Sequence, residues 1–136
     1  MLKAVIDTSV LVSGLINSRS SRQIILALEN SLFIPVISPA ILEELLDVLA
    51  RAKFHKNFNR ETASRLIETI KSQAIAVTPR MKLNAVPADP NDNCFIEAAL
   101  ASKADCVVSL DNHLLDLKSF NGIPILRPLD FIKRLK

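Results

Sequence analysis

Short apolar runs alternate with longer amphipathic segments along the whole chain. Apolar runs that contain β-branched residues predict buried strands, and segments with apolar positions three and four residues apart predict helices. The expected strands are 2–6, 32–37, 74–77, 104–110 and 123–126. The expected helices are 9–16, 23–28, 40–52, 61–73, 89–102, 112–117 and 129–135. This alternation predicts an α/β fold in which helices cover both faces of a parallel sheet.

Individual residues refine the prediction for two of these segments, strand 32–37 and helix 40–52. Pro35 lies inside the second expected strand and predicts an interruption or a bulge there. Ser38 and Pro39 then open the clearest helix, because serine suits the N-cap and proline suits the first turn.

The apolar stripe of helix 40–52 predicts how this helix is rotated. Its members are Ile41, Leu45, Val48 and Ala52. At about 100° per residue, Glu44 falls at the border of the stripe, whereas Glu43 falls on the far side. We therefore expect Glu44 to lean over the sheet edge and Glu43 to point into solvent.

Asp7 and Asp111 each follow an expected strand, and both are expected at the carboxyl edge of the sheet. Ligands of open α/β sheets bind at this edge, where the strand order reverses. Asp7 has a second interpretation as the N-cap of the following helix, and the stretch alone leaves both open.

Asp92 lies in the first turn of the helix that leads into the Asp111 strand, so a right-handed crossover brings it to the same edge. Taken singly, Asp92 fits a capping role as well, because Asp89 and Asp92 approximate a capping box. Clustered carboxylates repel unless cations intervene, and oxygen ligands suit Mg²⁺ or Mn²⁺. Such ions activate water and stabilise charge on phosphate. Of the histidines and cysteines, only His113 is expected near these acids, exposed on a short helix.

Composition narrows the functional classes. The 136 residues, 49% of them hydrophobic, fit one globular domain spanning residues 1–136. A net charge of +3 permits a nucleic-acid partner, while the absence of Trp and Tyr disfavours an aromatic stacking platform. Only two glycines occur, so no phosphate-binding glycine loop is expected.

The cellular setting follows from the cysteines and the N-terminus. Cys94 and Cys106 lie far apart in apolar stretches, which is typical of reduced core residues in a cytosolic protein. A strand follows Met1 directly, where a signal peptide would have an apolar core, and no run of eighteen apolar residues exists. We therefore expect a cytoplasmic protein without membrane spans.

A basic stretch follows helix 40–52. It contains Arg51, Lys53, His55, Lys56 and Arg60, with no acid between Asp47 and Glu61. Lysine and arginine neutralise the nucleic-acid backbone without reading sequence, so Arg51, Lys53 and Lys56 are candidate phosphate contacts. An ordinary solvated loop explains the stretch equally well.

Four motifs in this order resemble the PIN-domain family. They are Val-Ile-Asp7-Thr-Ser-Val-Leu-Val, Ser38-Pro-Ala-Ile-Leu-Glu43-Glu44-Leu, Asp89-Pro-Asn-Asp92-Asn-Cys-Phe-Ile-Glu-Ala-Ala and Val-Val-Ser109-Leu-Asp111-Asn-His-Leu-Leu. Within the family the chain is most similar to proteins described as toxins of prokaryotic toxin–antitoxin systems, akin to the virulence-associated protein C toxins.

This resemblance implies a Rossmann-like three-layer α/β/α fold with a five-stranded parallel sheet, and a Mg²⁺- or Mn²⁺-dependent endoribonuclease. The family's four acids fall on Asp7, Glu44, Asp92 and Asp111, which would be both catalytic and metal-binding. Ser9 matches a small polar position beside the metal. The family also implies a homodimer and inhibition by a cognate antitoxin protein.

Several alternatives stay open at this point. Asn93 is a second candidate for the third-acid position, and the number of metal ions, one or two, is not determined. A catalytically silent PIN-like module that binds RNA or protein is the second functional hypothesis. A phosphotransferase with Asp7 as nucleophile is disfavoured, because Ser9 stands where such enzymes have a second acid.

Overall fold

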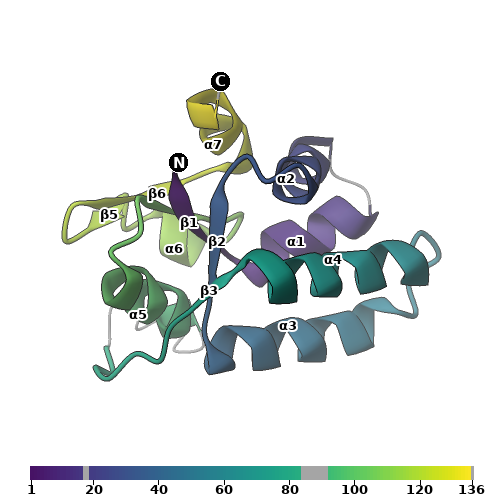
Figure 1. Cartoon of the computed structure of the whole chain (residues 1–136), viewed down its shortest axis with the longest axis horizontal. Coiled ribbons are helices and arrows are strands. Elements are labelled where there is room, and N and C mark those ends of the chain that lie inside the picture. The colour runs from purple at the N-terminus through teal and green to yellow at the C-terminus, as the bar shows by residue number, and fades with distance from the viewer. Residues whose placement is uncertain (17–18, 84–91, 136) are drawn as a thin grey trace.

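The computed structural model in Figure 1 describes residues 1–16, 19–83 and 92–135. Its strands are β1 (Lys3–Ile6), β2 (Ile34–Ile37), β3 (Ile75–Ala76), β4 (Cys106–Val108), β5 (Ser119–Phe120) and β6 (Ile123–Leu126). Its helices are α1 (Thr8–Ile16), α2 (Arg19–Glu29), α3 (Pro39–Ala52), α4 (Arg60–Gln73), α5 (Asn93–Ser102), α6 (Asn112–Leu115) and α7 (Pro128–Leu135). The expected alternation of strands and helices is confirmed.

The strands form one sheet in the order β3-β2-β1-β4-β6-β5. All neighbouring pairs are parallel except β5 and β6, which are antiparallel. The expectation of a five-stranded parallel sheet was therefore wrong by one edge strand. The extra strand arises because Asn121 and Gly122 both have positive φ, at 50° and 82°, and this tight turn folds 119–120 back onto β6.

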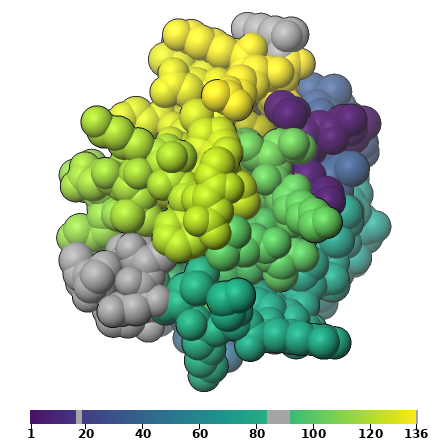
Figure 2. Space-filling model, turned by 90° about the vertical axis from the view of Figure 1, so that its left-hand side faces the viewer, coloured from purple at the N-terminus to yellow at the C-terminus, as the bar shows by residue number. Residues whose placement is uncertain are grey.

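Alternating residues of the central strands supply two separate cores, so the expected three-layer arrangement is confirmed. Ala4 and Ile6 of β1 pack with α1, α2, α4 and α7, whereas Val5 packs with α5 and α6. Figure 1 shows α5 and α6 on one side of the sheet and α1, α2 and α4 on the other. Figure 2 looks onto the first of these sides, where α5 in green lies beside the β5–β6 region in yellow-green.

Pro35 is accommodated within β2 without a break in the strand. The preceding Ile34 nitrogen donates to the carbonyl of Leu2, the residue just before β1, so the next nitrogen, that of Pro35, faces the opposite edge. There β3 begins to pair only at Val36. The missing N–H therefore costs no ladder hydrogen bond, and the expected interruption is absent.

Several expected boundaries differ from the structure. The expected start of a helix at Asp89 lies outside the described residues. The strand expected over 104–110 is shorter, so that Ser109 follows β4 directly and Asp111 instead caps α6. The helix expected over 23–28 is longer, since α2 begins at Arg19. In the described part of the chain, each helix is too short or too polar to cross a membrane.

The strand order reverses between β1 and β4. The chain runs outward from β1 through β2 to β3, and then returns to the other side of β1 to build β4, β6 and β5. This reversal point is where open α/β sheets bind their ligands, and its carboxyl edge carries Asp7 and Ser109.

Candidate metal centre

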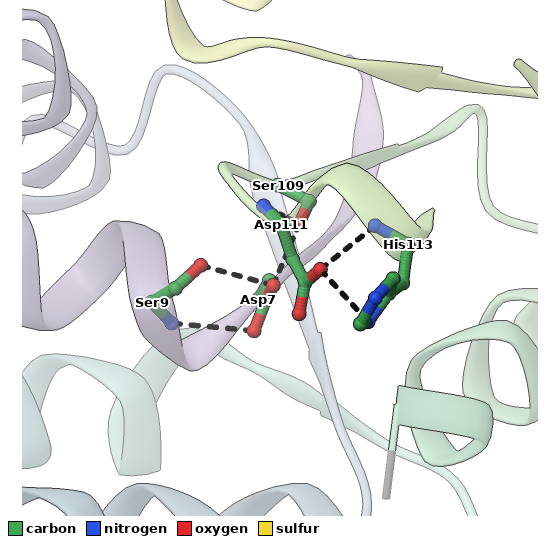
Figure 3. Close-up of polar contacts among 5 residues, drawn as sticks. All are labelled: Asp7, Ser9, Ser109, Asp111 and His113. Atoms are coloured by element: carbon green, nitrogen blue, oxygen red, sulfur yellow. Dashed lines mark hydrogen bonds and ion pairs between the residues drawn. The ribbon is translucent and has the colours of Figure 1, made fainter. Parts of the chain in front are cut away.

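Asp7 is a buried carboxylate, 3% exposed, and its oxygens accept hydrogen bonds from hydroxyl and backbone amide groups. Its Oδ2 accepts hydrogen bonds from Ser109 Oγ at 2.7 Å and from Ser9 Oγ at 3.0 Å, and its Oδ1 accepts one from Ser9 N at 3.2 Å (Figure 3). Burial nevertheless raises the pKa of Asp7 above 3.8, and the nearby charge of Asp111 adds to this rise. The site therefore favours a cation beside this carboxylate.

Ser109 joins the two strand ends. Its hydroxyl donates to Asp7 Oδ2 and accepts from the Asp111 backbone nitrogen at 2.9 Å. The pairing of Ile6 with Val108 in adjacent strands places Asp7 and Ser109 side by side. Ser109 was not among the candidate site residues. The signal was available, since a polar residue directly after a buried strand stands at the same edge as Asp7.

Asp111 and His113 form a local pair on the more open side of the site. Asp111 Oδ1 accepts a hydrogen bond from His113 N at 2.8 Å and lies 3.6 Å from His113 Nδ1 (Figure 3). One ligand atom from each of Asp92, Asp111 and His113 lies within 4.8 Å of the other two. His113 is exposed as expected, but its ring belongs to this cluster.

Cys94 lies between Glu44 and the other acids of the site. The Cys94 thiol lies 3.8 Å from Glu44 Oε2. Burial, together with the charges of Glu44, Asp92 and Asp7, raises the pKa of this thiol to about 12. The expectation that no cysteine lies near the acids was therefore wrong, because α5 begins at the site and Cys94 is its second residue.

The rotation of α3 agrees with its apolar stripe. Of the stripe, Ile41 and Leu45 are buried and Val48 and Ala52 are half-buried. Glu44 is half-buried and Glu43 is exposed. Both glutamates line a cleft of about 610 Å³ between α3 and α5. Glu44 thus stands where the cleft meets the cluster of acids.

The same cleft reaches part of the basic stretch. Arg51 lines it, and so does Lys82, a residue that was not among the candidate contacts. Lys53 lies over the Phe54 ring at 5.2 Å, and Lys53 and Lys56 are both exposed beyond the end of α3. Only Arg51 of the three candidate phosphate contacts therefore lines the cleft.

The remaining candidate residues flank the acids. Ser9 binds Asp7 through both its backbone and its hydroxyl group. Asn93 is buried at the first position of α5 and lines the cleft, whereas Asp92 lies in the cluster with Asp111. A carboxylate oxygen of Asp92 lies within 4.8 Å of one of Asp111.

The donor set fits a divalent cation. Ligands held at about 2.1 Å from one octahedral ion are about 3–4.2 Å apart, so small inward movements would bring Asp92, Asp111 and His113 onto a common ion. The buried charge of Asp7 lies next to them and would be offset by the same ion.

A family model described as a PIN domain matches residues 3–113, a span that contains all four acids. The chain belongs to the PIN-domain family. PIN domains are typically nucleases that act on RNA and use divalent metal ions. Membership therefore agrees with the donor set that the fold assembles at the carboxyl edge of β1 and β4.

Two further proteins are similar to this PIN domain. The uncharacterized protein MJ1680 of Methanocaldococcus jannaschii is 31% identical over 122 residues, which cover 88% of this chain and 77% of that protein. The crystal structure of PAE2754 from Pyrobaculum aerophilum superposes with a TM-score of 0.64 at 15% identity, covering 98% of this chain and 89% of that one. The second likeness concerns the fold alone.

Proposed function

We propose that this PIN domain is a divalent-metal-dependent endoribonuclease whose ion is held by Asp7, Glu44, Asp92 and Asp111. The observation that carries the proposal is the convergence of these carboxylates from four separate places in the chain. The charge of Asp111 acts on Asp7, and the charges of Glu44, Asp92 and Asp7 all act on Cys94. Such a concentration of negative charge at the reversal point of the sheet is suited to binding Mg²⁺ or Mn²⁺.

The protein's own part in the reaction is positioning. Ser9 and Ser109 hold both oxygens of Asp7 in one orientation, and Ser109 fixes the Asp111 backbone at the same time. A bound divalent ion would stabilise charge on the scissile phosphate and lower the pKa of the attacking water. Glu44, at the cleft side of the cluster, is placed to accept a proton from that water.

The cleft between α3 and α5 gives the RNA backbone a route to these acids. Arg51 follows Glu44 by seven residues, which is about two helical turns or about 10 Å along α3. Arg51 and Lys82 both line the cleft and would neutralise phosphates adjacent to the cleavage position. Glu43, Asp47 and Glu97 line the same cleft, so the cationic contacts there are few and local.

RNA cleavage with and without metal tests this function. Protein freed of metal is expected to be inactive in EDTA and to regain cleavage when Mn²⁺ is added in excess. Asp111→Asn should stay inactive under both conditions, whereas the exposed Glu43→Gln should behave as wild type. RNA binding without cleavage by the Mn²⁺-loaded wild type would favour the silent module instead.

We further propose that the nuclease is the toxin of a toxin–antitoxin pair, on the motif resemblance given above. A cytoplasmic setting, an antitoxin partner and a homodimer belong to the same proposal. Induced expression should arrest growth, and co-expression of the product of a small adjacent reading frame should relieve the arrest. Normal growth on induction of an RNA-cleaving protein would contradict the toxin role and leave the nuclease proposal intact.

A further inference from the structure

His113 is a potential nitrogen ligand in a site otherwise made of carboxylates. A ligand atom of His113 lies within 4.8 Å of ligand atoms of both Asp92 and Asp111. The side chain is 50% exposed and Asp111 is 29% exposed, so an ion from solvent can reach both. Figure 3 shows the imidazole and the Asp111 carboxylate on the same side of the α6 turn.

The first turn of α6 fixes the backbone of His113 beside Asp111. Asp111 Oδ1 accepts from the backbone nitrogen of His113, so the two residues are fixed relative to each other through the main chain. The neighbouring Leu114 is fully buried and anchors the short helix against the second core.

Imidazole changes which ions such a site selects. Mg²⁺ is a hard ion that strongly prefers oxygen ligands and keeps much of its water, whereas first-row transition ions accept imidazole readily. We infer that His113 ligates the ion together with Asp92 and Asp111, and that it makes the centre prefer transition-metal ions over Mg²⁺. This inference rests on the proposed metal site and assigns its ion class.

A rival interpretation is that His113 only packs against the cap of α6. The 3.6 Å separation between His113 Nδ1 and Asp111 Oδ1 is compatible with a simple pairing of imidazole and carboxylate. The two interpretations differ in one respect. A ligand contributes to affinity for nitrogen-accepting ions selectively, whereas a packing role affects all divalent ions alike.

Ion-binding titrations separate them. Untagged metal-free protein is titrated with Mg²⁺, Mn²⁺, Co²⁺ and Ni²⁺ by calorimetry, as wild type and as His113→Gln. We expect Mg²⁺ affinity to be unchanged by the substitution, and Co²⁺ and Ni²⁺ affinity to fall by roughly 10–100-fold or more, the loss growing from Mn²⁺ to Ni²⁺. An equal loss for all four ions, or no loss, would overturn the inference.

A spectroscopic signature gives a second readout that does not depend on affinity. Mn²⁺-loaded wild type should show ¹⁴N modulation from a coordinated imidazole in its electron spin echo. The chain contains two histidines, and the other, His55, accepts a hydrogen bond from the Asn57 backbone in an exposed turn after α3. His55→Gln is therefore the matched control, in which the modulation should persist, while His113→Gln should lose it.

The outcomes distinguish the proposed role of His113 from the proposed metal-dependent nuclease function on which it rests. Tight Mn²⁺ binding that needs Asp111 but shows no ¹⁴N modulation would overturn the role of His113 and leave the metal-dependent nuclease standing. Absence of saturable binding for all four ions, together with RNA cleavage in EDTA, would overturn both.

Discussion

The two strand ends of the candidate metal centre are built in opposite ways. Asp7 follows β1 and is 3% exposed, with both carboxylate oxygens engaged by serine donors. Asp111 is the third residue after β4, which ends at Val108, and its side chain is partly exposed. It pairs with the solvent-exposed His113. The Asp7 side is buried and hydrogen-bonded, whereas the Asp111 side is open to solvent.

The difference separates two tasks that a metal centre must perform. The Asp7 side fixes geometry, and burial raises the pKa of its carboxyl group, which favours a neutralising cation. In the proposed metal centre, the Asp111 side would admit the ion and the substrate from solvent. Ser109 connects them, since it donates to Asp7 and accepts from the Asp111 backbone. The comparison predicts that substitutions on the two sides affect stability differently while both abolish activity.

The largest expected effect comes from removing either strand-end charge. Asp7→Asn and Asp111→Asn should each reduce RNA cleavage by at least about 10²-fold, as expected for a positioned functional carboxylate. Because burial disfavours the Asp7 charge, Asp7→Asn should unfold in EDTA at neutral pH no more easily than wild type. Cleavage rates and urea unfolding measure this. Undiminished cleavage by either variant would remove that carboxylate from the site.

The two neighbouring glutamates of α3 offer the next largest contrast. Glu44 is half-buried beside Cys94, whereas Glu43 is exposed. Glu44→Gln should lower cleavage by about 10²-fold at saturating Mn²⁺, while Glu43→Gln should leave it nearly intact. If Glu43→Gln is the inactive variant and Glu44→Gln is active, the assignment of the second acid is wrong.

Breaking the connection between the two sides should have a moderate effect that depends on pH. Ser109→Ala removes the hydrogen bond that most lowers the pKa of Asp7, so this pKa should rise further, and unfolding should cost about 1–3 kcal/mol less. Since the folded protein holds the Asp7 proton at pH values where the unfolded chain has released it, stability falls as pH rises from 3.8 to the folded pKa. Ser109→Ala should extend this fall to higher pH.

Unfolding free energies in EDTA across the acidic and neutral range measure this effect. Ser102→Ala is the matched control, because Ser102 is also buried and its hydroxyl donates to the Ala99 carbonyl, away from Asp7. The same pH dependence in both serine variants would show that Ser109 does not govern Asp7.

The smallest expected effect concerns RNA affinity. Arg51→Ala combined with Lys56→Ala should weaken binding for all RNA sequences alike and reduce the salt dependence by about one unit of slope per lost contact. Because Arg51 lines the cleft and Lys56 does not, most of the change should come from Arg51. Filter binding at several salt concentrations measures it. An unchanged slope would return this stretch to an ordinary solvated loop.

Most of the fold could be predicted because its signals are local. Apolar runs located β1, β2, β4 and β6, and the stripe on α3 fixed the burial of Ile41 and Leu45. The edge strand β5 was missed, although the Asn121-Gly122 pair is a hairpin signal, because two residues are too few for a periodic pattern.

The site was less predictable, since its contacts join distant residues. The motifs located the four acids, but not which partners they meet. Ser109 and Asp7 are 102 residues apart and meet only through the register of β1 against β4. Cys94 looked like a core residue because Phe95 and Ile96 follow it in sequence, whereas its place at the start of α5 brings it beside Glu44.

Anomalous diffraction from a crystal of this protein soaked in Mn²⁺ tests the central claim most directly, because it locates the ion without reference to activity. The account predicts a manganese peak at the carboxyl edge of β1 and β4, among the carboxylates of Asp7, Glu44, Asp92 and Asp111. A fully soaked crystal that shows no manganese among these carboxylates, or shows it only elsewhere on the surface, would contradict the account.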